Sequence, residues 1–139
     1  MGANDEPPGE VLHEAAFARE HRLLEDLLEL LDARSSAGAE HAELLRILRE
    51  LEDRTTDHFR NEEVYMASID YGGLIAHQRV HRQLLSELAR QRAAYARTGG
   101  PLPARLRSFL YNWLSAHIED GQIKQRAFAA MSRLSAGME

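Results

Sequence analysis

The chain has 139 residues, of which 44% are hydrophobic, so it is large enough for one domain with a buried core. Its formal net charge of -5 argues against a nucleic-acid partner, because the phosphate backbone is bound mainly by an excess of Lys and Arg. There is no cysteine, which excludes disulfides, iron–sulfur clusters and thiol catalysis.

The N-terminal segment is polar and lacks the apolar stretch of a signal peptide. No apolar run approaches the roughly 20 residues that a membrane-spanning helix needs. The sequence therefore predicts a cytoplasmic protein without a membrane span. Residues 1–10 are expected to form a flexible arm, residues 11–134 one helical domain and residues 135–139 a C-terminal tail.

Four long amphipathic segments follow, separated by glycine, serine, proline and aspartate residues. Their apolar residues recur at intervals of three and four, which is typical of helices, and strand-like alternation is absent. The predicted helices are Val11–Asp32, Ala39–Ala67, Leu74–Arg97 and Pro103–Asp120, followed after Gly121 by a short piece, Gln122–Leu134. Because the connections are short, consecutive helices are expected to run antiparallel. The sequence thus predicts an all-α fold, an up-down-up-down four-helix bundle with a short C-terminal helix.

Histidines interrupt the apolar stripe that each predicted helix turns toward the core. A residue can join a site inside a bundle only if it shares that stripe with core residues. Five histidines and one glutamate meet this condition, so each of them takes the place of a core residue. The four stripes, in chain order, are Phe17, His21, Leu24, Leu28 and Leu31; Leu44, Leu48, Leu51, Thr55, His58 and Glu62; His77, His81, Leu84, Leu88, Gln91 and Tyr95; and Leu106, Leu110, Trp113 and His117.

These six candidates also fall at similar depths along the predicted bundle. With about 1.5 Å of rise per residue and antiparallel neighbours, the ends of the second and fourth helices meet the start of the third. Five buried imidazoles without metal would leave several polar groups unsatisfied, so the set predicts a metal site. His13 and His41 lie outside this layer, which favours a structural or surface role. Asp57 and Glu63 lie off the stripe and are expected to be solvated.

Two stretches of the chain resemble motifs of the hemerythrins, in particular the single-domain bacterial ones. The first resembles the family's HFxxEExxM motif, with Tyr71 following at the usual distance, and consists of His58, Phe59, Glu62, Glu63 and Met66. The second resembles FLxxWLxxHI and consists of Phe109, Leu110, Trp113, Leu114, His117 and Ile118. The candidate ligands also follow the family order, which is H, HxxxE, HxxxH and HxxxxD on four successive helices. The resemblance covers nearly the whole chain.

The resemblance implies a non-haem di-iron centre, in which two iron ions share a bridging hydroxide or oxide. Such a centre binds dioxygen reversibly, as a hydroperoxide on one iron, and serves as an oxygen carrier, store or sensor rather than an enzyme. The implied ligand is dioxygen, or another small diatomic molecule or peroxide. By this resemblance one iron is held by His77, His81 and His117, the other is held by His21 and His58, and Glu62 bridges the two.

One position departs from the family pattern. The second bridging carboxylate, five residues after the last histidine, corresponds here to Gln122. A carboxamide offers one good oxygen and no charge, so the site would be about one charge more positive and its diferric form less favoured. In a regular helix Asp120 follows the stripe of His117 more closely than Gln122 does, and Gly121 would permit a distortion. Gln122 is therefore the predicted seventh ligand, and Asp120 is its alternative.

Three other functions remain open. The same centre, with oxygen binding impaired by Gln122, would suit a di-iron enzyme that acts on peroxide or nitric oxide. A sensor would instead signal metal or oxygen occupancy to a protein partner. The third is a structural bundle loaded with zinc or manganese. A zinc protease is disfavoured, because His77 and His81 lack the glutamate of the HExxH motif. Candidates for an apolar pocket beside the metals are Leu24, Leu28, Leu114 and Ile118.

Overall fold

The structure is a computed structural model that describes the backbone of residues 8–114 and the side chains of residues 15–112 and 114. The helices are α1 (Pro8–Ser36), α2 (His41–Ser68), α3 (Leu74–Thr98) and α4 (Ala104–Phe109), and α4 continues into a π-helical stretch, Leu110–Leu114. Strands are absent from this part of the chain, which confirms the all-α prediction. None of the described helices combines the length and the apolarity that crossing a membrane requires.

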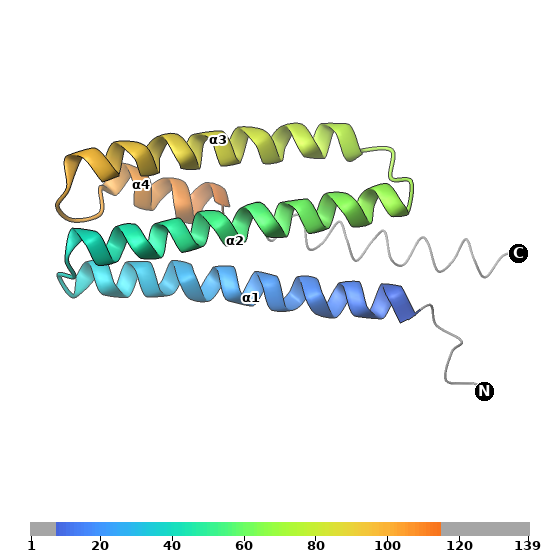
Figure 1. The fold of residues 1–139 in the computed structure, drawn as a ribbon, viewed down its shortest axis with the longest axis horizontal. Coiled ribbons are helices and arrows are strands. Elements are labelled where there is room, and N and C mark those ends of the chain that lie inside the picture. The colour runs from blue at the N-terminus through green and yellow to red at the C-terminus, as the bar shows by residue number, and fades with distance from the viewer. Residues whose placement is uncertain (1–7, 115–139) are drawn as a thin grey trace, which may run out of the picture.

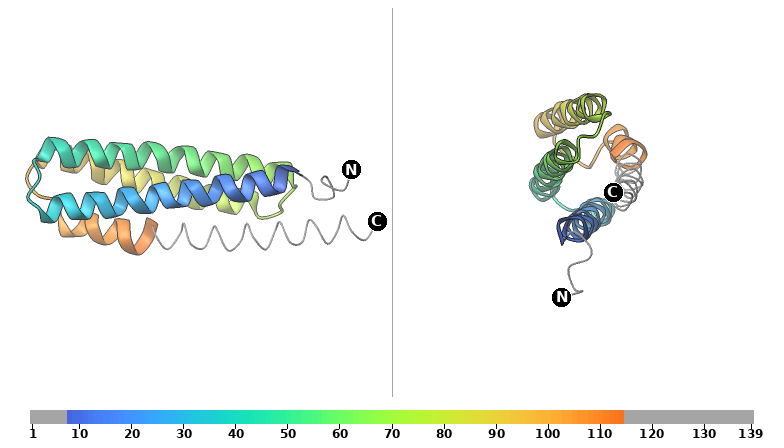
Figure 2. Two further views of the ribbon diagram at one scale, coloured as in Figure 1. Left: turned by 90° about the horizontal axis from the view of Figure 1, so that it is seen from below. Right: turned by 90° about the vertical axis from the view of Figure 1, so that its right-hand side faces the viewer.

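Consecutive helices run antiparallel, as Figure 1 shows, and the connections between them are short. Seen along their axes, in the right-hand panel of Figure 2, α1 to α4 surround a common centre. This arrangement is the predicted up-down-up-down bundle. The predicted short C-terminal helix lies outside the described residues.

The reversals after α1 and α2 use left-handed backbone at the end of a helix. After α1, Gly38 has φ 80°, a conformation that glycine adopts without strain, and the Ala39 N–H donates to the Arg34 carbonyl at 3.0 Å. After α2, Asp70 has φ 58°, and the Tyr71 N–H donates to the Met66 carbonyl, also at 3.0 Å. Both follow the Schellman pattern, which satisfies carbonyls that a helix end leaves without a partner.

The first helix is longer than predicted. It begins at Pro8, three residues before the expected start, because proline in the first turn lacks only an N–H that the helix does not use. It continues through Ser35 and Ser36, since serine inside a helix costs well under about 1 kcal/mol relative to alanine. The left-handed backbone at Gly38, rather than the two serines, therefore determines where α1 ends. The bounds of α2 and α3 lie within two residues of those predicted.

The predicted stripes form the core. Every stripe residue of α1, α2 and α3 is buried apart from Gln91, which is half-buried. The last helical segment contributes Leu106 and Leu110 as predicted, and Leu114 as well; the side chain of Trp113 lies outside the description. The leucines gather at the end of the bundle where α1 leads into α2, while the histidines of the stripes, His21, His58, His77 and His81, lie toward the other end. The bundle therefore has an apolar half and a polar half.

Two hydrogen bonds connect α1 with the last helical segment. Arg107 Nη2 donates to Asp32 Oδ1 at 2.6 Å, and the Tyr111 hydroxyl donates to the Leu28 carbonyl at 2.9 Å. Burial raises the pKa of Tyr111, so its phenol keeps the proton that it donates. The residues joined are 75 and 83 positions apart in the sequence, so these bonds close the bundle between its first and last described helices.

Replacing Leu48 with alanine is expected to lower the free energy of unfolding of the metal-free protein by about 2–5 kcal/mol. The side chain is 0% exposed, so its truncation leaves a cavity at the centre of the apolar half. Urea denaturation followed by circular dichroism measures the loss. Leu30→Ala is the matched control, because Leu30 is 45% exposed and its loss should stay within about 0.5 kcal/mol. Equal losses for the two variants would contradict the described core.

Candidate metal centre

Five of the predicted ligands lie together between α1, α2 and α3. His21 comes from α1, His58 and Glu62 are four residues apart on α2, and His77 and His81 are four apart on α3. A spacing of four places two side chains on one face of a helix, one turn apart. All five residues are at most 5% exposed. The sequence periodicity therefore placed these polar side chains correctly inside the bundle.

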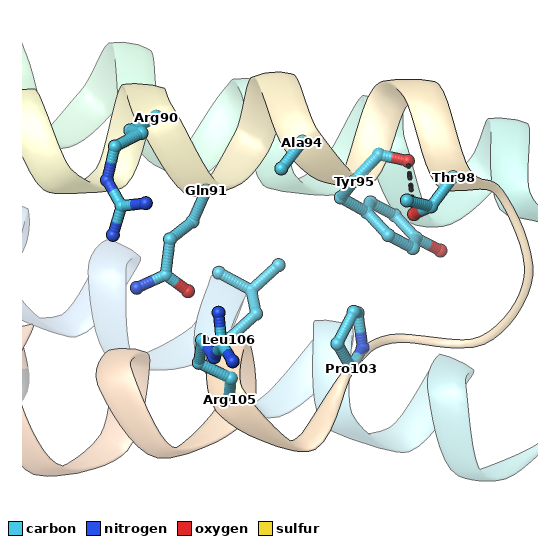
Figure 3. A pocket seen from close by; sticks show the side chains of 8 residues that line it. All are labelled: Arg90, Gln91, Ala94, Tyr95, Thr98, Pro103, Arg105 and Leu106. Atoms are coloured by element: carbon cyan, nitrogen blue, oxygen red, sulfur yellow. Dashed lines mark hydrogen bonds between the residues drawn. The ribbon is translucent and has the colours of Figure 1, made fainter.

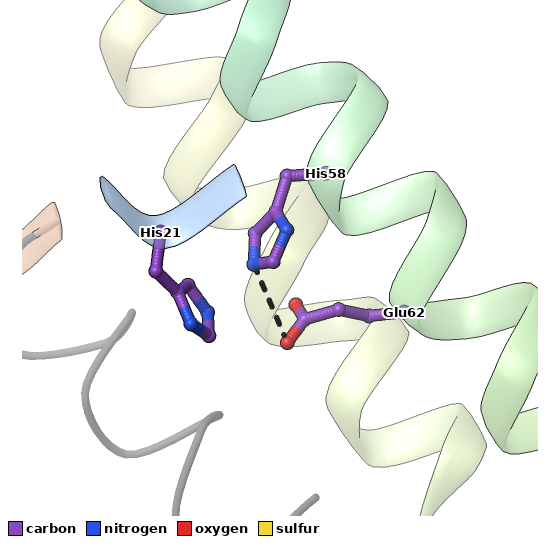
Figure 4. A group of neighbouring side chains, drawn as sticks. All are labelled: His21, His58 and Glu62. Carbon is purple, nitrogen blue, oxygen red and sulfur yellow. Dashed lines mark ion pairs between the residues drawn. The ribbon is translucent and has the colours of Figure 1, made fainter. Parts of the chain in front are cut away.

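One donor group consists of His21, His58 and Glu62, which point toward one another in Figure 4. The two imidazole rings meet edge to face with their centroids 4.5 Å apart. His58 Nε2 lies 3.5 Å from Glu62 Oε2, and one donor atom from each residue lies within 4.8 Å of the others. Three buried donors on two helices thus converge on one point.

A second donor group consists of Glu62, His77 and His81. The two rings again meet edge to face, with centroids 4.3 Å apart, and His81 Nε2 lies 3.3 Å from Glu62 Oε1. Its donor atoms also lie within 4.8 Å of one another. Glu62 belongs to both groups, and it turns Oε1 toward His81 and Oε2 toward His58. This is the placement of a carboxylate that bridges two neighbouring ions.

The geometry and chemistry of these donors fit a pair of metal ions. Two ligands about 2.1 Å from one ion and at right angles lie about 3 Å apart, close to the two observed separations. Imidazole nitrogen and carboxylate oxygen suit iron, zinc and manganese. In addition, His58 Nε2 is buried and has no hydrogen bond with the described residues. A buried acceptor left in this way costs stability, and a metal ion would satisfy it.

Glu62 is suited to carry the negative charge of such a centre. Burial acts to raise the pKa of its carboxyl, but the hydrogen bond with His81 and the nearby His58, His81 and His77 outweigh burial. The net result is a pKa below the ordinary value for glutamate. Glu62 is therefore a carboxylate at neutral pH even without metal, ready to act as a ligand.

A second carboxylate contacts His58 from outside the donor groups. Glu20 Oε1, on α1, lies 2.6 Å from His58 Nδ1, and Asn61 Nδ2 donates to Glu20 Oε2 at 2.8 Å. Because a carboxylate only accepts hydrogen bonds, Nδ1 of His58 carries the proton. Nε2 of the neutral ring then presents its lone pair on the side of Glu62. Glu20 thus fixes the tautomer that a metal ion requires.

His81, on α3, also contacts a carboxylate through Nδ1. Glu63 Oε2 lies 2.8 Å from His81 Nδ1, and the Phe59 ring stacks on the imidazole with centroids 3.8 Å apart and 3° between the planes. The prediction that Glu63 is solvated is therefore wrong. Its position lies off the inward stripe, but the side chain is long enough to reach across to α3. The same prediction for Asp57 is confirmed, because that residue is exposed.

The periodicity of the sequence did not predict the contacts of Glu20 and Glu63 with the histidines. Helix phase shows which face a residue occupies, but not that a long side chain beside the stripe bends toward a neighbouring helix. Only their positions in the sequence could have indicated these contacts, since Glu20 directly precedes His21 and Glu63 directly follows Glu62.

The other candidates divide into two sets. His117, Ile118, Asp120 and Gln122 lie outside the described residues, as does the side chain of His13. His41 is half-buried at the start of α2, where its ring meets Tyr95 edge to face at 4.5 Å. It lies 17 residues before His58 on the same helix, or about 25 Å along the axis. His41 therefore lies apart from the cluster, as predicted.

Figure 3 shows a surface pocket of about 270 Å³. Its lining residues on α3 belong to the last part of that helix, whereas His77 and His81 lie near its start. The guanidinium groups of the pocket belong to Arg90, which is paired with Glu87, and to Arg105. No histidine or carboxylate is among the residues that line it, so it does not compete as a metal site. These residues are Arg90, Gln91, Ala94, Tyr95, Thr98, Pro103, Arg105 and Leu106.

The chain is similar to proteins of one known family. The sequence profile of the family described as "Hemerythrin HHE cation binding domain" matches residues 13–121, which include the five described candidate ligands and His117. Bacteriohemerythrin from Pseudomonas paraeruginosa is 29% identical over 73% of this chain and 65% of its own length. Bacteriohemerythrin from Pseudomonas aeruginosa LESB58 is 30% identical over 71% of this chain and 63% of its own.

A third relative is a myohemerythrin. Myohemerythrin-1 from Phascolopsis gouldii is 32% identical over 57% of this chain and 60% of its own length. The chain thus spans less than two thirds of the length of these relatives. No solved structure gave a significant match.

Proposed function

The chain belongs to the hemerythrin family, and from this premise we propose that it holds two iron ions and binds dioxygen reversibly. It would act as an oxygen carrier, store or sensor rather than an enzyme. The observation that carries the proposal is the shared Glu62, whose two oxygens face different histidine groups within one buried cluster. A single-ion site has no need of a carboxylate placed in this way.

The proposed ligand sets follow the two donor groups. One iron is held by His21 and His58, the other by His77, His81 and His117, and Glu62 bridges them. Gln122 is proposed as the seventh ligand, with Asp120 as the alternative, and a hydroxide or oxide completes the bridge. Two iron ions held there would supply the two electrons that reversible oxygen binding requires, and a bridging hydroxide would supply the proton. The finer proposal is that oxygen would be held as a hydroperoxide.

The described residues support binding rather than activation of oxygen. The two donor groups contain four imidazoles and one carboxylate, whereas di-iron bundles that activate oxygen use four carboxylates and two histidines. Leu24, Leu28 and Leu114 are buried in the core, and we assign them the role of excluding water. Dry surroundings strengthen the interaction of the ions with Glu62 and keep protons away from the bound ligand.

Gln122 favours a second candidate function. A neutral amide at the position of the second bridging carboxylate would weaken oxygen carriage, which favours an enzyme that acts on peroxide or nitric oxide at the same centre, or a sensor. Turnover of peroxide without damage to the protein would support the enzyme. A metal-dependent change in the binding of a protein partner would support the sensor.

An anaerobic titration with ferrous iron, with optical spectra recorded before and after oxygen is added, tests the proposal. We expect two irons per chain and an oxygen-dependent charge-transfer band that disappears when oxygen is removed. His58→Ala should reduce the stoichiometry below two, whereas His41→Ala should keep it at two, because His41 lies far from the cluster. One iron per native chain, or irreversible oxidation, would reject the carrier function and favour the alternatives.

A further inference from the structure

The side of α3 that faces away from the bundle carries a row of arginines. α3 lies along one edge of the bundle in Figure 1, and its inward stripe, which includes His77 and Leu88, packs into the core. The opposite side presents residues at intervals of three and four, which places them on one face of the helix. All of them are exposed except the half-buried Ala93, and they are Arg79, Arg82, Ser86, Arg90, Ala93 and Arg97. At about 1.5 Å of rise per residue, the arginine row is about 27 Å long.

The arginine row carries charge of one sign, unlike the outer sides of the first two helices. α3 contains five arginines and one acidic residue, Glu87, although the formal net charge of the whole chain is -5. The outer sides of α1 and α2 mix both signs: Arg22 and Asp26 are exposed on α1, and Arg49 and Asp53 are exposed on α2. The positive charge is therefore a local feature of α3 and not a property of the whole surface.

Most of this charge has no partner inside the described part of the chain. Arg90 pairs with Glu87 one turn away on α3. Three arginines of the row have no ion pair with any described residue, and they are Arg79, Arg82 and Arg97. Arg79 and Arg82 also lie one turn apart, where like charges repel each other and destabilise a helix. The row thus contributes little to the stability of α3, and its charge is available to an external carboxylate.

We propose that the arginine row is a docking surface for an acidic helix of a partner protein. A helix with carboxylates at intervals of three and four presents them in one row, which matches the spacing and the width of the arginine row. Ser86 and Ala93 have small side chains, so the backbone of such a helix can approach closely between the guanidinium groups. Guanidinium groups bind carboxylates with two parallel hydrogen bonds, which adds specificity to the attraction.

A broad anionic surface fits the arginine row less well than a single helix does. The axes of packed helices are about 8–10 Å apart, and charges act over about 10 Å at 0.1 M salt. A lipid bilayer or a nucleic-acid duplex along α3 would therefore also meet the field of exposed carboxylates on α2, such as Asp53 and Asp57. The formal net charge of -5 repels such a surface further. A narrow partner gains the attraction of the row and avoids most of this repulsion.

Fluorescence anisotropy of a labelled acidic peptide, titrated with the full chain, tests the proposal. The peptide is a helix of about 20 residues, which is long enough to span the arginine row, with glutamates along one face. A second peptide has the same composition but distributes its glutamates around the helix. We expect the first peptide to bind about 10-fold more tightly than the second, because only the first can pair several carboxylates with the row at once. Binding should weaken as salt is added, since the pairs are exposed.

The variant R79Q/R82Q/R97Q removes the three arginines that lack an internal ion pair. It should bind the first peptide about 10-fold more weakly than the native chain does, because three exposed ion pairs are lost together. The matched control is R22Q/R46Q/R49Q, which removes the same charge from exposed positions on α1 and α2. The control should bind the first peptide as tightly as the native chain. Circular dichroism verifies that both variants fold.

The outcomes separate a specific surface from general attraction between charges. Equal losses in the two triple variants, or equal binding of the two peptides, would overturn the proposal, because net charge alone would then explain the affinity. Binding to phosphatidylserine vesicles or to duplex DNA that is tighter than binding to the first peptide would overturn the choice of an acidic helix as the partner. The proposal also fails if sedimentation shows self-association of the native chain that R79Q/R82Q/R97Q abolishes, since the occupant of the row would then be a second copy of this chain.

Discussion

Replacing Glu62 with glutamine is expected to weaken metal binding by more than about 100-fold, beyond the range typical for residues that only support a ligand. Glu62 is the one described residue that belongs to both donor groups. Its amide analogue offers one good oxygen instead of two and carries no charge, so it cannot bridge two ions equally. Isothermal titration with zinc, and iron analysis of protein loaded anaerobically, measure the loss and the stoichiometry.

Glu50→Gln provides the control for this substitution. Glu50 lies on the same helix but on its exposed face, where it pairs with Arg54, so the variant should retain two ions at native affinity. If E62Q also retained two tightly bound ions, the two donor groups would not share a bridging carboxylate. The assignment of Glu62, and with it the two-metal centre, would then be wrong.

Metal loading is expected to raise the free energy of unfolding by about 5 kcal/mol when free metal is 100-fold above the dissociation constant of each of two sites. The unfolded chain has no preformed site, so the binding energy stabilises the folded state alone. The metal-free protein, by contrast, buries four imidazoles and a carboxylate in its core. Urea denaturation of apo and zinc-loaded protein at matched concentration measures the difference.

The E62Q variant separates this effect from general stabilisation by salt or by unspecific metal binding. Its free energy of unfolding should respond to zinc far less than that of the native chain. A strong chelator added to the loaded native protein should return the unfolding curve to that of the apo protein. Unfolding curves that coincide with and without zinc would mean that the cluster does not bind metal in the folded state.

Periodicity in the sequence was sufficient to predict the fold and the location of the cluster. His58 and Glu62 continue a stripe of leucines at intervals of three and four, and His77 and His81 open the next one, so their burial follows from helix geometry. The burial of His21 follows in the same way from its position on the apolar stripe of α1. In each case the backbone alone determines the direction of the side chain, and for that reason no long-range information was needed.

The remaining features depend on side-chain reach and on local energetics. Glu20 and Glu63 contact histidines on neighbouring helices, and which rotamer brings each carboxylate there depends on packing that no single helix specifies. The end of α1 was predicted too early because Ser35 and Ser36 were treated as breakers. Their intrinsic cost in a helix is small compared with the benefit of continuing to the left-handed Gly38.

The hydrogen bonds from Arg107 and Tyr111 to α1 have a consequence for how the bundle assembles. The α1–α2 contact is formed across a connection of four residues, whereas Tyr111 and Leu28 are separated by 83. Loop-closure entropy grows by about 0.6 kcal/mol per doubling of loop length, so the α1–α4 contact costs about 2.6 kcal/mol more to close. We therefore expect the helical hairpins to form before the α1–α4 seam closes. Because that seam contacts α1 at Leu28 and Asp32, in the apolar half of the bundle, we expect the leucine core to close in the last of these steps.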